Sequence, residues 1–430
     1  MQNPTLTPIL LGLGVLSLAA AVLSAASAEG PQDRKTSKTP EDQAVRVNGT
    51  NVAGDNARPG TRPLAEIQTF LADAENHRTL DVNDPKDLWV PAGVDREYLA
   101  GRIPANNPLT KAKIELGRQL YFDPRLSKDL TVSCATCHNP AKGWTDHQAT
   151  STGIGGQHGG RSAPTVFNRV LSPTGIQFWD GRAASLEEQS LGPIGNPIEM
   201  GFSVAEAAAR LNAIPGYKMQ FDKVFGGEAT GERISMAIAS FERTILAGGA
   251  PEDYFAAAEP FRGAADPEET AEEKARREQI LAEEKAHPFS EAALRGRNLY
   301  FGKAQCNLCH VGPNFSDESF HNLGIGATGT DALKDKGRED HTKQEADRGK
   351  FRTPTARNSR DTAPFMHDGS LLTLKEVVEH YNKGGNPNRW LSKEKLRPLG
   401  LTPQEVADVV AYLEQGLQGE VTKVDVPTLP

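Results

Sequence analysis

Cysteine is scarce in this chain, and its scarcity shows where the chemistry lies. The sequence has only four cysteines, and all four belong to two copies of the pattern C-x-x-C-H. This pattern is typical of covalent haem attachment, in which two thiols bond to the porphyrin and the histidine binds its iron. A zinc or redox dithiol would be a serious alternative for one copy, but two copies that use every cysteine favour haem. We therefore predict two covalently bound haem c groups and no structural disulfide, with the attachment residues Cys134, Cys137 and His138 in one copy and Cys306, Cys309 and His310 in the other.

An excess of positive charge is also missing. The net charge is −8, which disfavours nucleic acid as a partner and suits either simple solubility or a basic protein partner. With 430 residues, of which 37% are hydrophobic, the chain is typical of a soluble globular protein of two or three domains.

Long hydrophobic runs are limited to one near the N-terminus. Residues 9–23 are apolar and uncharged, and Ala26-Ser27-Ala28 follows as a small-residue cleavage site, although no Lys or Arg precedes the run. The run is too short for a comfortable membrane span. We therefore predict a signal peptide over 1–28 and no membrane span after its removal. Covalent haem attachment takes place outside the bacterial cytoplasm, so the signal and the haem motifs agree on the periplasm.

Alternating strand patterns are nearly absent, which predicts a mainly α fold. Apolar spacing predicts helices over 111–122 and 231–247, and a charged, exposed helical segment lies within 265–288. Residues 29–63 are polar and rich in Pro, Gly, Asn and Thr, as in a disordered linker. Four further helix starts are predicted where Ser or Thr precedes Glu by three residues, at Ser185, Ser203, Thr373 and Thr402.

Four landmarks occur twice in the same order, which indicates an internal duplication. They are Gly-Arg-x-Leu-Tyr-Phe, C-x-x-C-H, Pro-Thr-x-x-Asn, and Asp-Gly followed by Leu and Glu; the first copies begin at 117, 134, 164 and 180 and the second at 296, 306, 354 and 368. We predict two tandem cytochrome c-like haem domains, the N-terminal one over 64–264 and the C-terminal one over 289–430, joined by the charged insertion over 265–288.

The two predicted haems differ in the residue available on the side of the iron opposite the histidine. That position decides whether a haem transfers electrons or binds a small molecule. Tyr381 is a candidate iron ligand in the second domain, with His380 and Met366 as rivals. The repeat offset carries Tyr381 back to Pro193, which has no group that can bind iron. We therefore expect the first haem to be open to peroxide and the second to be closed.

An open haem needs an acid/base group to move a proton between the peroxide oxygens. Glu199 follows Pro193 closely and is the candidate, with Gln189 as a second polar group. Trp179 has an easily oxidised indole that would suit charge transfer between the haems. The plainer alternatives are a surface glutamate, an exposed amide and a core tryptophan.

Together these motifs resemble the bacterial di-haem cytochrome c peroxidase family, including its MauG-like branch, over residues 95–415. The segments that carry the resemblance are 116–123, 134–138, 163–165, 177–182, 196–200, 306–310 and 362–369. The resemblance implies that the haem held by His138 is peroxidatic and that the haem held by His310 transfers electrons. It also assigns Trp179 to the inter-haem position, and Gln189 and Glu199 to the distal pocket.

Two departures from the standard peroxidase pattern matter for function. Tyr381 stands where the standard peroxidases have methionine, and tyrosine there is the mark of the MauG-like branch. A phenolate favours oxidised iron, so a low potential is implied for the second haem. Many relatives cap the resting first haem with a loop histidine, where this chain has Ile154. His158 is a nearby rival for that role, and His147 is a second one.

The resemblance also implies one calcium ion between the domains. The backbone carbonyls of Thr362 and Pro364 would be ligands, but Ser162 replaces an asparagine that normally contributes. Calcium prefers several oxygen ligands, and this replacement removes one side-chain carbonyl.

The predicted function is a periplasmic peroxidase that reduces hydrogen peroxide with electrons from a small redox protein, a cytochrome c or a cupredoxin. One alternative is MauG-like oxidation of a protein substrate through a high-valent state of the two haems. Another is an electron carrier without catalysis. The donor, the true substrate and the oligomeric state are left open by the sequence.

Overall fold

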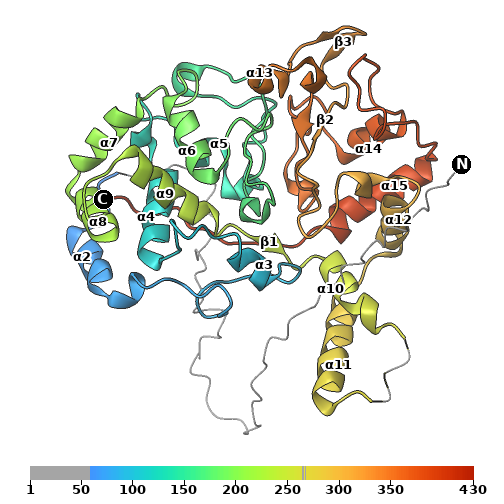
Figure 1. The fold of residues 1–430 in the computed structure, drawn as a ribbon, viewed down its shortest axis with the longest axis horizontal. Coiled ribbons are helices and arrows are strands. Elements are labelled where there is room, and N and C mark those ends of the chain that lie inside the picture. Colours follow the sequence, from blue (N-terminus) through green and yellow to red (C-terminus); the bar gives the residue numbers. More distant parts are fainter. Residues whose placement is uncertain (1–58, 264–265, 267) are drawn as a thin grey trace, which may run out of the picture. The chain divides into compact units, whose positions relative to one another are not determined.

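The computed structural model describes residues 59–263, 266 and 268–430 (Figure 1). The predicted signal peptide over 1–28 and most of the predicted linker over 29–63 lie outside the described residues. Helices dominate the described part, as predicted, and its strands are only two or three residues long. None of the helices within these residues is long and apolar enough to cross a membrane.

The first repeat is organised around two helices, α4 and α9, which pack side by side (Figure 1). Shorter helices and the loops between them surround this pair and carry the site residues. The helices of this repeat are α2 (Leu64–Ala72), α3 (Arg96–Ala100), α4 (Lys111–Phe122), α5 (Cys134–Cys137), α6 (Leu186–Gly195), α7 (Val204–Asn212), α8 (Pro215–Phe225) and α9 (Gly231–Glu242).

The second repeat is organised in the same way around α12 and α15 (Figure 1). Its helices are α12 (Glu291–Phe301), α13 (Glu339–Thr342), α14 (Leu374–Asn382) and α15 (Pro403–Ala411), which continues as the π-helical turn η10 (Tyr412–Gly416). Between the repeats lie α10 (Pro251–Ala258) and α11 (Ala271–Ala286), and α11 has no buried residue, as expected of the charged segment.

Six short strands form three antiparallel pairs in the described residues. Strand β1 (Ala247–Gly248) pairs with β6 (Glu420–Val421), β2 (Phe320–His321) with β5 (Phe351–Arg352), and β3 (Ala327–Gly329) with β4 (Ala332–Leu333). The first pair joins the residues just after α9 to the C-terminal tail, so the tail after η10 returns to the first repeat.

All four helix starts expected from Ser/Thr-x-x-Glu are confirmed. The side-chain oxygens of Ser185, Ser203, Thr373 and Thr402 each accept a hydrogen bond from the backbone N–H of the glutamate three residues later, at the start of α6, α7, α14 and α15. Such caps satisfy backbone donors that the first helical turn leaves unpaired. The predicted helix over 111–122 is confirmed as α4.

Matching close contacts confirm the duplication in three dimensions. A Cβ added to Gly117 of α4 would lie 1.9 Å from the carbonyl oxygen of Ala237, and one added to Gly296 of α12 would lie 1.9 Å from that of Asp408. Only glycine allows helices to approach so closely. These pairs place α4 over α9 and α12 over α15 in equivalent ways.

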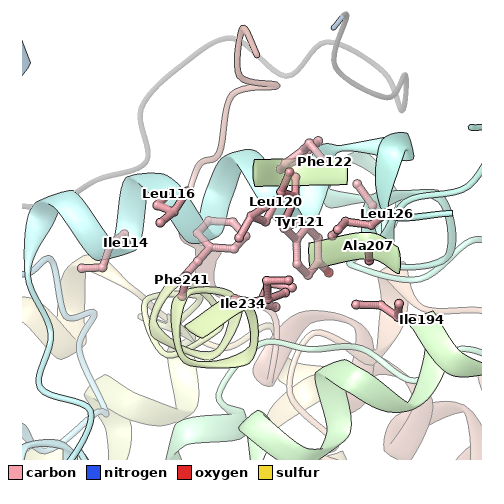
Figure 2. Packing of buried hydrophobic residues seen from close by; sticks show 14 of the residues in the cluster. Ile114, Leu116, Leu120, Tyr121, Phe122, Leu126, Ile194, Ala207, Ile234 and Phe241 are labelled. Atoms are coloured by element: carbon pink, nitrogen blue, oxygen red, sulfur yellow. The ribbon is translucent and has the colours of Figure 1, made fainter. Parts of the chain in front are cut away.

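The core of the first repeat consists of aromatic and aliphatic side chains from α4, α9 and the helices around them (Figure 2). The rings of Tyr121 and Phe241 meet edge to face with centroids 5.1 Å apart, and Tyr300 and Tyr412 repeat this geometry at 5.1 Å in the second repeat. Edge-to-face pairs add about 0.5–1.5 kcal/mol to area burial.

The helix predicted over 231–247 is wrong at its C-terminal end. Helix α9 ends at Glu242, and the backbone then leaves the helix and enters β1. The partner strand lies more than 170 residues away, and Val424 and Leu429 of the following tail join the core of the first repeat. Residues 59–63 contact the same tail, since the backbone N–H of Arg62 donates to the carbonyl of Leu429 at 2.8 Å.

Candidate active site

The first cavity, which we define by the residues around His138, gathers the predicted site residues of the first repeat. Helix α5 supplies the cysteines, α6 supplies Gln189 and Pro193, and the loop after α6 supplies Glu199. The lining includes Cys134, Cys137, His138, Trp179, Gln189, Pro193 and Glu199.

The second cavity, around His310, is lined by the corresponding residues of the second repeat. Both attachment cysteines line it, and α14 contributes Tyr381. Its lining includes Cys306, Cys309, His310, Thr362, Pro364, Met366, His367 and Tyr381. Each C-x-x-C-H copy therefore faces a cavity of its own, as two bound haems require.

Both motif histidines are oriented for metal binding. Nδ1 of His138 lies 3.4 Å from the carbonyl oxygen of Trp144, and Nδ1 of His310 lies 3.1 Å from that of Phe315. A proton on Nδ1 leaves Nε2 free as the iron ligand and fixes the ring orientation. Burial lowers the pKa of both histidines, which favours the neutral form that binds metal.

The four cysteines are unpaired thiols and none is bonded to another. Burial raises the pKa of Cys134, and it raises the pKa of Cys137 to about 11. Buried, protonated thiols are poor redox nucleophiles. This argues against a redox dithiol and fits thiols placed to be consumed by haem attachment.

A rival metal site exists beside the second motif. One ligand atom from each of Cys309, Asp317 and His321 lies within 4.8 Å of the others. Asp317 and His321 already form an ion pair at 3.1 Å. Cys309 is also a thiol of the haem motif. Its sulfur cannot serve both as a thiolate ligand of a metal here and as the thioether that attaches the haem.

Glu199 lines the first cavity beside Pro193, and α6 contributes no iron ligand to this cavity. Oε1 of Glu199 accepts a hydrogen bond from Nδ2 of Asn196 at 2.7 Å. Burial raises the pKa of Glu199, although the charge of Arg182 and the Asn196 hydrogen bond oppose this. A carboxyl with a raised pKa is suited to accept and return a proton near neutral pH.

Neither loop histidine lines the first cavity. His158 is exposed and lies 3.3 Å from the hydroxyl of Thr152, while Nε2 of His147 lies 3.0 Å from the carbonyl of Asp361 in the second repeat. Ile154 packs against the hydrophobic core instead of facing the cavity. The arrangement leaves the first cavity without a histidine on its distal side among the described residues.

Tyr381 and Pro193 occupy matching places in the two repeats. Each lies at the same sequence distance from the residue that caps its helix, Thr373 for α14 and Ser185 for α6. Burial raises the pKa of the Tyr381 phenol, so its phenolate needs a nearby cation such as ferric iron.

The rivals of Tyr381 are placed differently. His380 points away from the second cavity, since its Nε2 lies 3.0 Å from the carbonyl of Leu323. Met366, whose backbone φ is 72°, lines the second cavity and therefore remains a rival iron ligand.

Trp179 lines both cavities, together with Ser162 and Arg352. The indole Nε1 donates to the carbonyl of Ser162 at 2.8 Å, and the backbone N–H of Arg352 donates to the carbonyl of Trp179 at 2.8 Å. The indole is thus fixed between the two predicted haem sites.

Thr362 and Pro364 line the second cavity at a cis peptide bond between Ala363 and Pro364. Among the described residues, no backbone or side-chain donor hydrogen-bonds to either carbonyl oxygen. Free carbonyls of this kind are what a calcium ion would use.

Sequence reasoning missed Arg352, which lines both cavities. The repeat contained the signal, because aligning Pro164 with Pro354 places Arg352 opposite Ser162. The repeats thus differ by a long cation opposite a small hydroxyl, just as they differ by Tyr381 opposite Pro193.

Comparisons with known proteins agree on one family. The family model described as di-haem cytochrome c peroxidase matches residues 111–260. The chain is 39% identical over 329 residues to the methylamine utilization protein MauG of Methylorubrum extorquens, covering 76% of this chain and 84% of that one. It is 36% identical to the cytochrome c551 peroxidase of Nitrosomonas europaea, covering 77% and 90%.

Among solved structures, a MauG-like protein associated with microbial copper homeostasis superposes with a TM-score of 0.62. The two are 30% identical, and the match covers 77% of this chain and 93% of the other.

Proposed function

The chain belongs to the di-haem cytochrome c peroxidase family, and from this premise we propose that it reduces hydrogen peroxide with electrons from a small periplasmic redox protein, a cytochrome c or a cupredoxin. The reaction converts H2O2, two electrons and two protons into two molecules of water. The two C-x-x-C-H copies would hold the haems, which would supply the redox chemistry of peroxide reduction and electron transfer.

The difference between the two cavities carries this proposal. The first cavity has Pro193 where the second has Tyr381, and it has Glu199 on the same wall. A plain electron carrier would need a protein ligand on both irons. Peroxide chemistry instead requires a side of the iron without a protein ligand and a buried carboxyl group beside it. The first cavity offers both.

The residues predicted for the first cavity have the following roles in this mechanism. Glu199 takes the proton from the peroxide oxygen that binds first and returns it to the departing oxygen, which leaves as water. Gln189 orients the peroxide by hydrogen bonding, and Pro193 keeps space for it. Trp179 bridges the cavities and provides the path for electrons. His138 and His310 would hold the irons through Nε2, and the four cysteines would hold the porphyrins.

A steady-state assay tests the proposal. The haem-loaded protein should consume peroxide when a reduced cytochrome c or cupredoxin is supplied. The absence of peroxide consumption with every reduced donor would contradict it.

Oxidation of a protein substrate is the second candidate, and Tyr381 is the observation that favours it. A buried phenolate stabilises oxidised iron, so the second site would hold oxidising equivalents more readily than a methionine-ligated one. Peroxide-dependent covalent modification of a partner protein, without turnover of a cytochrome donor, would support this candidate over the first.

The remaining features of the site are also proposals. Covalent attachment through both C-x-x-C-H copies, location in the periplasm and one calcium ion at Thr362 and Pro364 fit the motifs and the carbonyls described above. Haem stain that survives denaturing electrophoresis would test the attachment, and metal analysis of the purified protein would test the calcium.

A further inference from the structure

A buried cluster of three charged residues lies between the two cavities. We call Arg169, Glu318 and Arg352 the Arg-Glu-Arg triad. Nη1 and Nη2 of Arg169 donate to the two carboxylate oxygens of Glu318 at 2.7 and 3.1 Å, and Nη1 of Arg352 donates to Glu318 at 2.9 Å. The exposed fractions are 8%, 2% and 3%. The triad joins the first repeat to the second and is almost fully removed from solvent.

The triad has a net charge of plus one, and that charge belongs chiefly to Arg352. Arg169 and Glu318 already form a complete two-bond pair. Burial alone would raise the pKa of Glu318, but the two guanidinium charges outweigh it and the pKa lies below its usual value. Burial and the charge of Arg169 lower the pKa of Arg352 to about 10 despite the attraction of Glu318. An uncompensated buried cation is unfavourable and calls for an anion.

The neighbouring carboxylates do not supply that anion. Asp180 and Asp335 are both bound to Arg161, at 2.7 Å each. Glu242 lines the first cavity, but burial raises its pKa to about 8, so it is largely protonated at neutral pH. The missing charge must come from a group that the cavities bind.

Arg352 has a donor left for such a group. Its Nε donates to the carbonyl of Phe178 at 3.3 Å, and Nη1 donates to Glu318 and to the carbonyl of Thr353. Nη2 donates to no described residue. A guanidinium Nη2 carries two N–H groups. Arg352 also lines both cavities, and β5 holds it in place through the pairing of Arg352 with Phe320.

We propose that Arg352 binds a propionate carboxylate of each haem through Nη2, so that one buried cation sets the potentials of both haems together. The inference rests on the proposed function, because it needs a haem in each cavity. A guanidinium suits this role better than an ammonium, since its planar N–H groups match carboxylates. The positive charge stabilises the reduced, less positive state of each iron. Removal of the charge should therefore lower both midpoint potentials.

A redox titration of the haem-loaded protein, followed in its visible spectrum, tests this proposal. Arg352→Gln should shift the reduction equilibrium of each haem about tenfold toward the oxidised state. For a one-electron couple this lowers each midpoint potential by about 59 mV. Arg352→Gln leaves Glu318 paired with Arg169, so no buried anion is stranded. Glu318→Gln raises the triad charge to plus two and should raise both potentials. Arg352→Lys keeps the charge and should stay near the parent protein.

The control is Arg389→Gln, which removes an exposed arginine from the same repeat and should change neither potential. A structural role for the triad alone would not give shifts of opposite sign in Arg352→Gln and Glu318→Gln. Shifts of the same sign, or a shift of only one haem, would overturn the proposal. The haem content of the parent protein is measured first, and fewer than two haems per chain would refute the proposed function instead. If Arg352→Gln does not fold, the sign of the shift in Glu318→Gln decides.

Discussion

Replacement of Glu199 by glutamine tests the proton-transfer step at the first cavity. Glutamine has nearly the same shape, and its Oε1 can still accept the hydrogen bond that Asn196 Nδ2 donates to Glu199 at 2.7 Å. The variant should therefore fold and bind haem normally. It cannot accept a proton at this position, and general acid–base groups contribute about 10²–10⁴-fold to rates. We expect the peroxide reaction to slow by that factor, a barrier increase of about 2.7–5.4 kcal/mol.

Stopped-flow spectroscopy of the oxidised protein mixed with peroxide measures this step directly. The reacting form of Glu199 is the carboxylate, which is populated above its pKa, and burial raises that pKa. The parent rate should fall as the pH is lowered through this raised pKa, whereas Glu199→Gln should lose this step. Glu228→Gln removes an exposed carboxylate from the same repeat and serves as the control. An unchanged peroxide rate in Glu199→Gln would refute the role of Glu199.

Three further changes test other parts of the account. Tyr381→Met should raise the midpoint potential of the second haem in a redox titration, and an unchanged potential would show that Tyr381 is not an iron ligand. The double variant Cys134→Ala/Cys137→Ala should lose covalent haem from the first site only, and an unaltered haem stain per chain would contradict the assignment. Gly117→Ala would place a Cβ 1.9 Å from a backbone oxygen and should cost about 1–3 kcal/mol in urea unfolding. Gly195→Ala, where no atom lies within 4 Å of the added Cβ, should cost much less, and equal losses would contradict the helix packing.

Local patterns in the sequence predicted the elements that depend on nearby residues. The helix starts at Ser185 and Thr373 follow from hydrogen bonds within one turn, and the structure has both. The cysteines and the histidine of each C-x-x-C-H copy line one cavity, as expected of residues that attach a haem. The repeat offset also placed Pro193 and Tyr381 at equivalent positions, because the same helix was duplicated.

Features that depend on distant partners could not be predicted in this way. Helix α9 stops early because the following residues pair with Glu420 and Val421, and nothing near residue 242 indicates that partner. His147 contacts Asp361 of the other repeat, which its sequence neighbours do not reveal. Whether the charge of Arg352 is compensated depends on Glu318 and Arg169, which are distant from Arg352 in the sequence.

Electron paramagnetic resonance of the fully oxidised, haem-loaded protein tests the central claim most directly. The claim is that the first haem is open at Pro193 and the second is closed by Tyr381. The account predicts one high-spin ferric signal and one low-spin ferric signal in equal amounts. Two low-spin signals would show that both irons carry a ligand on each side, and would contradict it.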